Sequence, residues 1–423
     1  MKNNKKSAKF YLSLVIFSLV GQVAWVVENM YLNVFIYKMF NSSASQISMM
    51  VAASAVTATV TTLLIGALSD KIGKRKIFIC GGYIVWGISI LGFALIRSAW
   101  IGSLSLCISL TIVLDCVMTF FGSSANDAAF NAWLTDSTDE TNRGAIEGIN
   151  AMMPLVAILA VFGGFMSLDQ GLQKSWTIIF TVIGAVVVVL GIAGFFLIHE
   201  TGTKCKDNSN YFANIFYGFR HSVIKQNLPL YATLVALALF NISIQIFMPY
   251  LILYYQVSLG MDNYVMIFAP AIVVAAVFTG LYGKVFDRKG FRFAVIPTLL
   301  MLALGYVGLY FFRGTALVFV SSLVMMCGYL GTGAMIGAQI RACTPNNKAG
   351  MFQGLRIVGQ VLIPGVIGPA IGAAILANAD TIVNSDGTTS FIPNETIFLG
   401  ALVALVVTFV ALVPLFKLLK KAK

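Results

Sequence analysis

Long apolar stretches recur along the whole chain and constrain its fold more than any other feature. Each is about twenty residues long, which as a helix is enough to cross a hydrocarbon core about 30 Å thick. Helices are expected, because lipid cannot satisfy open backbone groups and the alternating pattern of outer-membrane strands is missing. Hydropathy predicts twelve spans, at 10–37, 46–69, 77–97, 101–132, 144–167, 175–198, 228–257, 263–283, 293–312, 315–340, 349–377 and 396–416.

Composition and charge support a multi-pass membrane protein. Hydrophobic residues make up 59% of the 423 residues and charged residues 10%, which a soluble chain of this length does not show. Twelve spans place both termini on one side, and 23 of the 28 Lys and Arg fall in the termini and loops of that side. The positive-inside rule therefore predicts cytoplasmic termini in a plasma (inner) membrane. The net charge of +12 reflects this topology, and we expect no nucleic-acid partner.

Two loops repeat and predict an internal duplication. "GALSDKIGKRK" begins at Gly66, between the second and third spans, and "GKVFDRKGFR" begins at Gly283, between the eighth and ninth. "RGAIEGIN" and "KAGMFQGLR" repeat in the same way at the starts of the fifth and eleventh spans. Such duplications are common in secondary transporters. We expect two halves at 1–198 and 227–423, joined by a cytoplasmic linker at 199–226.

These loops resemble the signature of the major facilitator superfamily: a glycine, three residues, an aspartate, a basic residue, one residue, a glycine and further basic residues. The first copy matches fully and the second nearly. The resemblance implies an all-α membrane fold of two pseudo-symmetric six-helix bundles that rock about a central cavity, in a monomer. The run "NDAAFNAWLTD" before Arg143 also resembles the glycoside-pentoside-hexuronide and sucrose-carrier-like sugar:cation symporters.

In that family the signature aspartate and arginine help to hold a cytoplasmic gate. The resemblance extends this role to an acidic-x6-basic segment, although Arg341 takes the place of the acidic residue in the second half. The glutamate one turn after that segment is expected to belong to the same cytoplasmic network. The alternative is that all these charges are solvated loop anchors. The gate residues implied are Gly66, Asp70, Gly73, Arg75, Asp136, Arg143, Glu147, Gly283, Asp287, Gly290 and Arg292.

Carboxylates inside the spans are candidates for ion coupling, because an ionisable group there costs about 3 kcal/mol or more unless it faces a cavity or a partner. Glu28 in the first span and Asp115, deep in the fourth, are the two candidates for binding a proton or another cation. A carboxyl group held away from water can load and release a proton as access alternates. The alternative for Glu28 is a hydrated position near the outer surface.

Asp127 and Arg356 form a candidate interhelical ion pair. Arg356 is the one cation within a predicted span and needs an anion, which Asp127, Glu147 or an anionic substrate can supply. Asp127 has the competing interpretation of a solvated helix end.

Amides and tyrosines within the spans form a candidate substrate site. Amide spacing on the first span predicts one polar stripe if the span is α-helical. The seventh span offers amides one turn apart and a tyrosine beside a proline, while later tyrosines on that span fit an interfacial belt. The candidates are Gln22, Asn29, Asn33, Asn241, Gln245, Tyr250 and Gln360.

These features predict a proton- or cation-coupled symporter of a small, sugar-like polar solute. A proton-coupled drug exporter is the alternative, and a receptor or scaffold without transport is the third possibility. An enzyme is not expected, since the two histidines, His199 and His221, fall in one loop without a nucleophile partner. No phosphate-binding glycine loop or metal motif occurs in the sequence, so neither a cofactor nor a metal is predicted.

Overall fold

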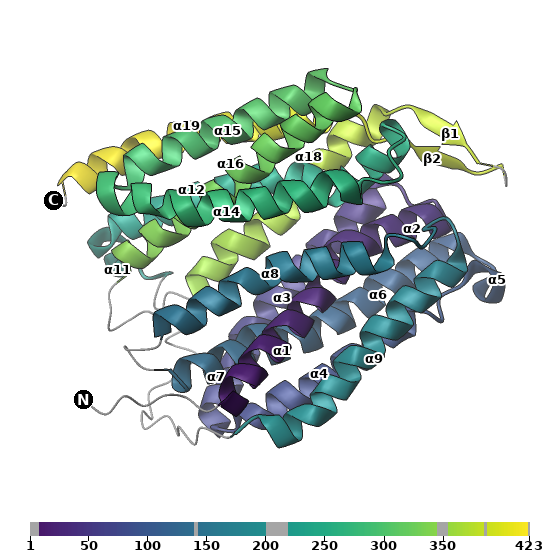
Figure 1. Ribbon diagram of the computed structural model, residues 1–423, viewed down its shortest axis with the longest axis horizontal. Coiled ribbons are helices and arrows are strands. Elements are labelled where there is room, and N and C mark those ends of the chain that lie inside the picture. The colour runs from purple at the N-terminus through teal and green to yellow at the C-terminus, as the bar shows by residue number, and fades with distance from the viewer. Residues whose placement is uncertain (1–7, 139–142, 200–218, 345–353, 385–386, 422–423) are drawn as a thin grey trace. The chain divides into compact units, whose positions relative to one another are not determined.

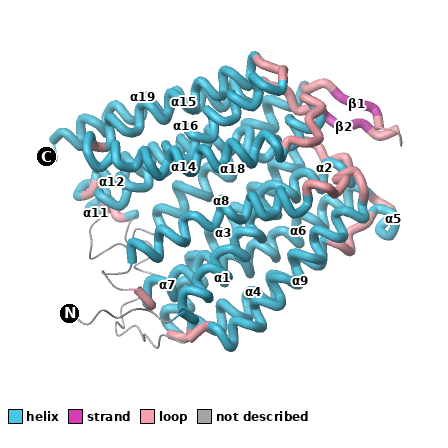
Figure 2. Tube along the Cα trace, viewed as in Figure 1, coloured by secondary structure: helices cyan, strands magenta, loops and turns pink. Residues whose placement is uncertain are grey.

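The computed structural model describes residues 8–138, 143–199, 219–344, 354–384 and 387–421. Helices occupy nearly all of the described chain, as Figures 1 and 2 show. Eleven of the described helices are long and apolar enough to cross a membrane, and the shorter apolar helix Met152–Phe165 is the twelfth. The predicted fold class and the number of spans are therefore confirmed.

Contacts divide the chain into two compact units. Unit 1 comprises Met1–Ser42 and Thr57–Asn210, and unit 2 comprises Ser43–Val56 and Tyr211–Lys423. The first part of helix α3 (Ala44–Ile72) thus groups with unit 2. The predicted limits at 198 and 227 remain a prediction, and most of the 199–226 linker lies outside the described residues.

Unit 1 contains the first, third, fourth, fifth and sixth spans and the end of the second. The first and fourth spans each form one unbroken helix in which a short segment is π-helical rather than α-helical. The elements are α1 Ala8–Val26, η1 Val27–Tyr31, α2 Leu32–Phe40, α4 Arg75–Phe93, α5 Ser98–Ile101, α6 Leu104–Gly122, η2 Ser123–Phe130, α7 Asn131–Asp136, α8 Arg143–Phe165 and α9 Gln173–Leu197.

Unit 2 contains the remaining spans, and its seventh and eleventh spans also include π-helical segments. Its elements are α11 His221–Gln226, α12 Leu228–Phe247, η4 Met248–Tyr250, α13 Leu251–Leu253, η5 Tyr254–Ser258, α14 Val265–Lys289, α15 Phe291–Phe311, α16 Thr315–Cys343, η7 Val358–Leu362, α18 Ile363–Ile375, η8 Leu376–Asn378, β1 Thr381–Val383, β2 Thr389–Phe391 and α19 Thr396–Lys421.

Each unit repeats the same helix pairings. In unit 1, α1 packs against α8 and α9, and α4 packs against α6 and α9. In unit 2, α12 packs against α18 and α19, and α15 packs against α16 and α19. The turns match as well: Gly73, before α4, and Gly290, before α15, have φ of 66° and 81°, a conformation that favours glycine. The backbone therefore carries the duplication seen in the sequence.

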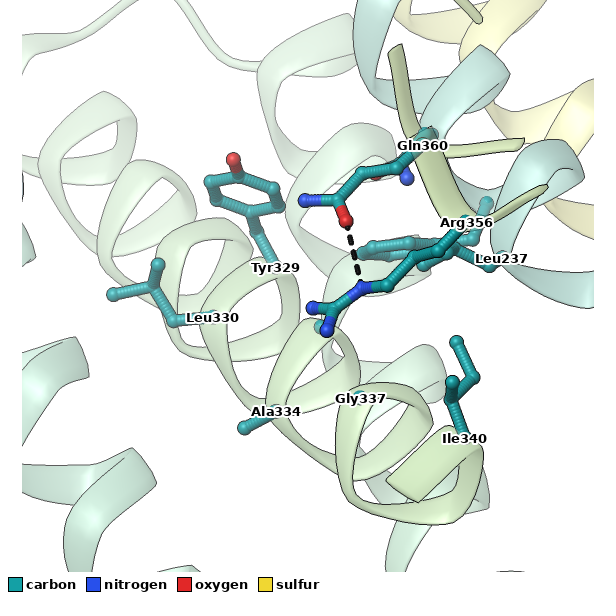
Figure 3. A pocket seen from close by; sticks show the side chains of 11 residues that line it. Leu237, Tyr329, Leu330, Ala334, Gly337, Ile340, Arg356 and Gln360 are labelled. Atoms are coloured by element: carbon teal, nitrogen blue, oxygen red, sulfur yellow. Dashed lines mark hydrogen bonds between the residues drawn. The ribbon is translucent and has the colours of Figure 1, made fainter. Parts of the chain in front are cut away.

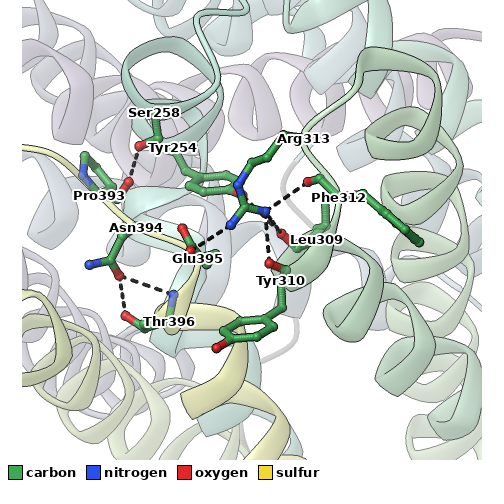
Figure 4. A network of polar contacts seen from close by, with 10 residues as sticks. All are labelled: Tyr254, Ser258, Leu309, Tyr310, Phe312, Arg313, Pro393, Asn394, Glu395 and Thr396. Atoms are coloured by element: carbon green, nitrogen blue, oxygen red, sulfur yellow. Dashed lines mark hydrogen bonds and ion pairs between the residues drawn. The ribbon is translucent and has the colours of Figure 1, made fainter.

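A short hairpin and an ion pair order one end of unit 2. Strands β1 and β2 pair antiparallel, with Ile382 opposite Ser390, which the all-helical expectation missed. Arg313 donates from Nη1 to the carbonyls that end α15 and pairs through Nη2 with Glu395 Oε1 at 2.8 Å (Figure 4). Because both side chains are partly exposed, the pair contributes only about 0–1 kcal/mol. Its main effect is to tie the end of α15 to the start of α19.

Candidate functional site

A buried pair of carboxylates lies in unit 1, where the first and fourth spans meet. Glu28, in η1, is 7% exposed and Asp115, in α6, is 2% exposed. Thr119, one turn after Asp115, donates from Oγ1 to Glu28 Oε1 at 2.9 Å. The two carboxylates are close enough for their charges to interact. The structure thus brings together the two residues that the sequence predicted separately.

Two buried negative charges this close are unfavourable unless something neutralises one of them. Asp115 Oδ1 is buried and has no hydrogen-bond partner among the described residues. No group of three or more His, Cys, Asp or Glu that could hold a metal occurs in the described part of the chain. The pair is therefore suited to take up a proton or a single small cation, with Thr119 fixing the position of Glu28.

Three of the π-helical segments contain a predicted site residue: Glu28 in η1, Asp127 in η2 and Gln360 in η7. An extra residue per turn rotates the side chains that follow, and such segments often occur at functional sites. The predicted stripe on the first span assumed α-helical spacing. In the structure Gln22 is half-buried, Asn29 is exposed and Asn33 is buried, so these amides do not share one environment.

Local backbone contacts hold the amides of the first span. Asn29 Nδ2 donates to the carbonyl of Trp25 at 2.8 Å, and Asn33 Nδ2 donates to the carbonyl of Asn29 at 3.0 Å. Asn33 Oδ1 is buried without a hydrogen-bond partner among the described residues. Asp127 accepts from Ser123 Oγ at 3.0 Å.

One part of the predicted gate is assembled within unit 1. Arg75, 7% exposed, donates from Nε to Asp136 Oδ2 at 3.2 Å and from Nη1 to Ser69 Oγ at 2.6 Å. Ser69 Oγ in turn donates to the carbonyl of Gly66 at 3.0 Å. The end of α3 and the start of α4 are thereby linked to the end of α7.

The corresponding part of unit 2 is built differently. Arg292 lies over the ring of Phe416, 5.6 Å from its centroid, and Asp287 is exposed. Gly283 lies within α14. This agrees with the sequence difference between the halves, because Arg341 occupies the position that corresponds to Asp136, the acidic partner of Arg75 in unit 1. The side chains of Asp70, Arg143 and Glu147 lie outside the described part of the structure, so their predicted roles stay predictions.

We expect Arg75→Gln to destabilise the protein by about 1–3 kcal/mol, because it breaks charge-assisted hydrogen bonds that are shielded from water. Combining it with Asp136→Asn should cost less than the sum of the two single changes, since both remove the same interaction. Thermal unfolding in detergent measures this, with the exposed Lys71→Gln as the control. Additive effects would contradict a coupled pair.

A cavity of about 250 Å³ opens in unit 2 and gathers two of the predicted substrate residues (Figure 3). Asn241 comes from α12 and Gln360 from η7, while small residues of α16 leave the space open. Arg356 Nε donates to Gln360 Oε1 at 3.1 Å. The lining residues are Leu237, Phe240, Asn241, Tyr329, Leu330, Gly333, Ala334, Gly337, Ile340, Arg356 and Gln360.

Two predicted substrate residues of the seventh span do not line this cavity. Tyr250 is fully buried and donates to the carbonyl of Pro369 at 3.2 Å. Gln245 packs closely on Gly368, where an added Cβ would lie 2.5 Å from Gln245 Cβ. Asp127 and Arg356 belong to different units, so their pairing remains a prediction.

Sequence reasoning missed Thr119 and Tyr329. Thr119 follows Asp115 by four residues, so its position on the same helix face was available as a signal. Tyr329 has no polar neighbour in sequence that marks it, and only the packing of α16 against α12 brings it to the cavity.

The fold is shared with solved transporters at low sequence identity. A mutant of the nucleoside transporter NupG is 13% identical, with a TM-score of 0.73 over 96% of this chain and 99% of that one. A bacterial homolog of the human lysosomal transporter Spinster is 14% identical, with a TM-score of 0.75 over 97% and 98%. A D-xylose-proton symporter is 13% identical, with a TM-score of 0.74 over 95% and 96%.

Among curated proteins, no sequence matches the chain at a significant level. The sequence profile of the Major Facilitator Superfamily, however, matches residues 12–369. That match covers most of the chain, so the protein belongs to the Major Facilitator Superfamily and is a membrane transporter, not an enzyme.

Proposed function

We propose that the protein is a secondary active transporter that carries a small, sugar-like polar solute together with a proton or another cation, by alternating access. The carboxylate pair of unit 1 carries this proposal. Burying two acids whose charges interact is costly, and a bound proton or cation offsets that cost. If one access state opens the pair to water and the other closes it, loading and release of the ion become linked to the conformational cycle.

The cavity of unit 2 supports the solute half of the proposal. Asn241 and Gln360 offer amide donors and acceptors, and Tyr329 offers an aromatic ring. Its volume of about 250 Å³ lies just below the usual range of ligand sites, which is roughly 300–1,000 Å³. A solute of monosaccharide size is therefore the best match.

Uptake into proteoliposomes under an imposed pH gradient tests this function. The panel should include neutral sugars, nucleosides, sugar acids and lipophilic cations, because the similar solved proteins include a nucleoside transporter and a D-xylose-proton symporter. Accumulation of a polar ring solute that collapses with a protonophore supports the proposal. Accumulation that follows a sodium gradient alone would assign the coupling to that cation.

The alternative, a proton-coupled drug exporter, is expected to have a cavity with a different charge in its lining. Lipophilic cations favour an acidic lining, whereas the described lining residues of this cavity include the cation Arg356 and no carboxylate. Gradient-driven export of a lipophilic cation with no movement of polar solutes would establish the alternative.

We expect Gly337→Leu to weaken solute binding by at least about 10-fold without unfolding the protein. An added Cβ at Gly337 meets no atom within 4 Å, so the larger side chain extends into the cavity rather than into packed helices. Gly280→Leu is the matched control, since Gly280 on α14 is equally open and does not line the cavity. Displacing a bound solute by an occluding side chain removes well over the 1.4 kcal/mol that a tenfold loss represents. Equal affinity in the two variants would contradict a solute site here.

A further inference from the structure

Six cations gather at one end of unit 2, where α14 ends, α15 begins and α19 ends. We call them the basic end of unit 2; they are Lys284, Arg288, Lys289, Arg292, Lys417 and Lys420. All six side chains are exposed, and none forms an ion pair with a described residue. Asp287 is the one acidic residue in the described segments 284–292 and 416–420. This surface therefore carries a net positive charge that the described part of the protein does not neutralise.

Aromatic rings hold the three helix ends together. Phe291 of α15 contacts Phe286 of α14 and Phe416 of α19, with ring centroids 6.4 and 6.0 Å apart. The guanidinium of Arg292 lies over the Phe416 ring, 5.6 Å from its centroid. Helix α15 also packs against both α14 and α19 along its length (Figure 1). The six cations thus belong to one packed surface rather than to separate loops.

The internal duplication gives a comparison for this charge. Arg292 is the counterpart of Arg75 in the loop repeat. Arg75 is buried and bonds to Asp136 at 3.2 Å, whereas Arg292 is exposed and has no carboxylate partner among the described residues. The positive-inside rule requires cations on one side of the membrane, but it does not require them to gather without acids on one surface. The arrangement in unit 2 therefore needs a further explanation.

Exposed apolar stripes run along two of these helices and end in the cations. On α19 the exposed side chains of Val410 and Val413 are followed one turn later by Lys417. One face of α14 has the same order: Val277, Leu281, Lys284 and Arg288. An exposed apolar stripe on a spanning helix lies against lipid tails, and a cation at its end lies at the depth of the lipid headgroups. A ligand of this surface can therefore combine apolar chains with an anionic head.

We infer that the basic end of unit 2 binds an anionic phospholipid, with the phosphate of the headgroup at the cations and the acyl chains along the apolar stripes. Clustered Lys and Arg beside a membrane-spanning helix attract anionic lipids, and Arg and Lys both bind phosphate oxygens. The apolar stripes favour a lipid over a free phosphate or an acidic protein, neither of which would use them. The inference does not depend on which solute the protein transports.

Native mass spectrometry of the purified full-length protein tests the inference by measuring the affinity of the first bound lipid. The probes are dioleoyl phosphatidylglycerol and dioleoyl phosphatidylcholine, which have the same acyl chains and differ in net charge. Phosphatidylglycerol is expected to bind about 10-fold or more tightly than phosphatidylcholine. The triple variant Arg292→Gln, Lys417→Gln and Lys420→Gln should remove most of that preference, since several cations contribute to it.

A matched control removes three cations from unit 1 instead. Lys71, Lys74 and Lys76 lie at the end of α3 and the start of α4, and changing all three to Gln should leave the preference for phosphatidylglycerol intact. A charge-conserving variant of the basic end, with Arg292→Lys, Lys417→Arg and Lys420→Arg, should also keep it. This second variant separates the loss of charge from any change in folding, because it alters the same exposed positions.

Several outcomes would overturn the inference. Equal affinity for the two lipids, or a preference that survives Arg292→Gln, Lys417→Gln and Lys420→Gln, would show that the basic end does not select an anionic lipid. An equal loss in the unit 1 control would show general attraction between charges rather than a site. Displacement of phosphatidylglycerol by an equal concentration of glycerol 3-phosphate, which has the headgroup charge without acyl chains, would assign the surface to a soluble phosphate.

Discussion

Glu28→Gln and Asp115→Asn are each expected to abolish gradient-driven accumulation while leaving solute exchange intact. Each change removes one acid from the buried pair and keeps the side-chain size, so the remaining carboxylate no longer interacts with a second negative charge that favours uptake of a proton when the site opens to one side. One pH unit across the membrane is worth about 1.4 kcal/mol per proton. A gradient of about two units can therefore sustain up to about 100-fold accumulation in the unchanged protein, and the variants should fall to about one-fold.

The matched control is Asp169→Asn, an exposed carboxylate of unit 1 whose Oδ1 accepts from the backbone N–H of Gly171 at 2.8 Å. An asparagine retains that hydrogen bond, so accumulation should be unchanged. Exchange of labelled for unlabelled solute at equal pH reports that the variants still bind and move solute. Accumulation that survives in both Glu28→Gln and Asp115→Asn would remove the pair from the mechanism.

Gly184→Ala is expected to lower the stability of the protein although it adds only a single methyl group. Helices α4 and α9 approach so closely that a Cβ at Gly184 would lie 2.9 Å from the carbonyl oxygen of Gly87. A backbone atom cannot rotate away as a side chain can, so the helices must separate. We expect a loss of about 1–3 kcal/mol, as for other overpacked interiors, and a lower midpoint of thermal unfolding in detergent.

Gly163→Ala is a control variant that is expected to raise the stability of the protein rather than lower it. Gly163 lies in α8, and an added Cβ there meets no atom within 4 Å. Replacing a helical glycine by alanine without steric conflict should stabilise the protein by up to about 1 kcal/mol. Unfolding midpoints that shift equally in both variants would contradict the close approach of α4 and α9.

Hydropathy was sufficient to predict the twelve spans because a helix in lipid must be long, apolar and internally hydrogen-bonded. The loop repeat predicted the duplication, and the positive φ of Gly73 and Gly290 shows it in the backbone. The π-helical segments were not predictable in this way. An extra residue in a turn leaves hydropathy unchanged, so the relative directions of Gln22, Asn29 and Asn33 required the structure.

The sequence predicted which residues belong to the candidate site better than it predicted how they lie relative to one another. Glu28 and Asp115 were singled out because acids inside spans are costly, but which acids face each other depends on how the first and fourth spans pack. Arg356 and Gln360 are four residues apart in sequence, yet the sequence assigned the first to an ion pair and the second to the substrate. The structure shows that both line the cavity beside α16.

Proton movement during solute uptake is the most direct test of the account. Adding the transported solute to right-side-out vesicles in weak buffer should make the medium more alkaline, as protons enter with the solute. The account predicts this change in the unchanged protein and in Asp169→Asn, and its absence in Glu28→Gln and Asp115→Asn. An equal alkaline shift in all four proteins would contradict the claim that the buried pair of unit 1 carries the proton.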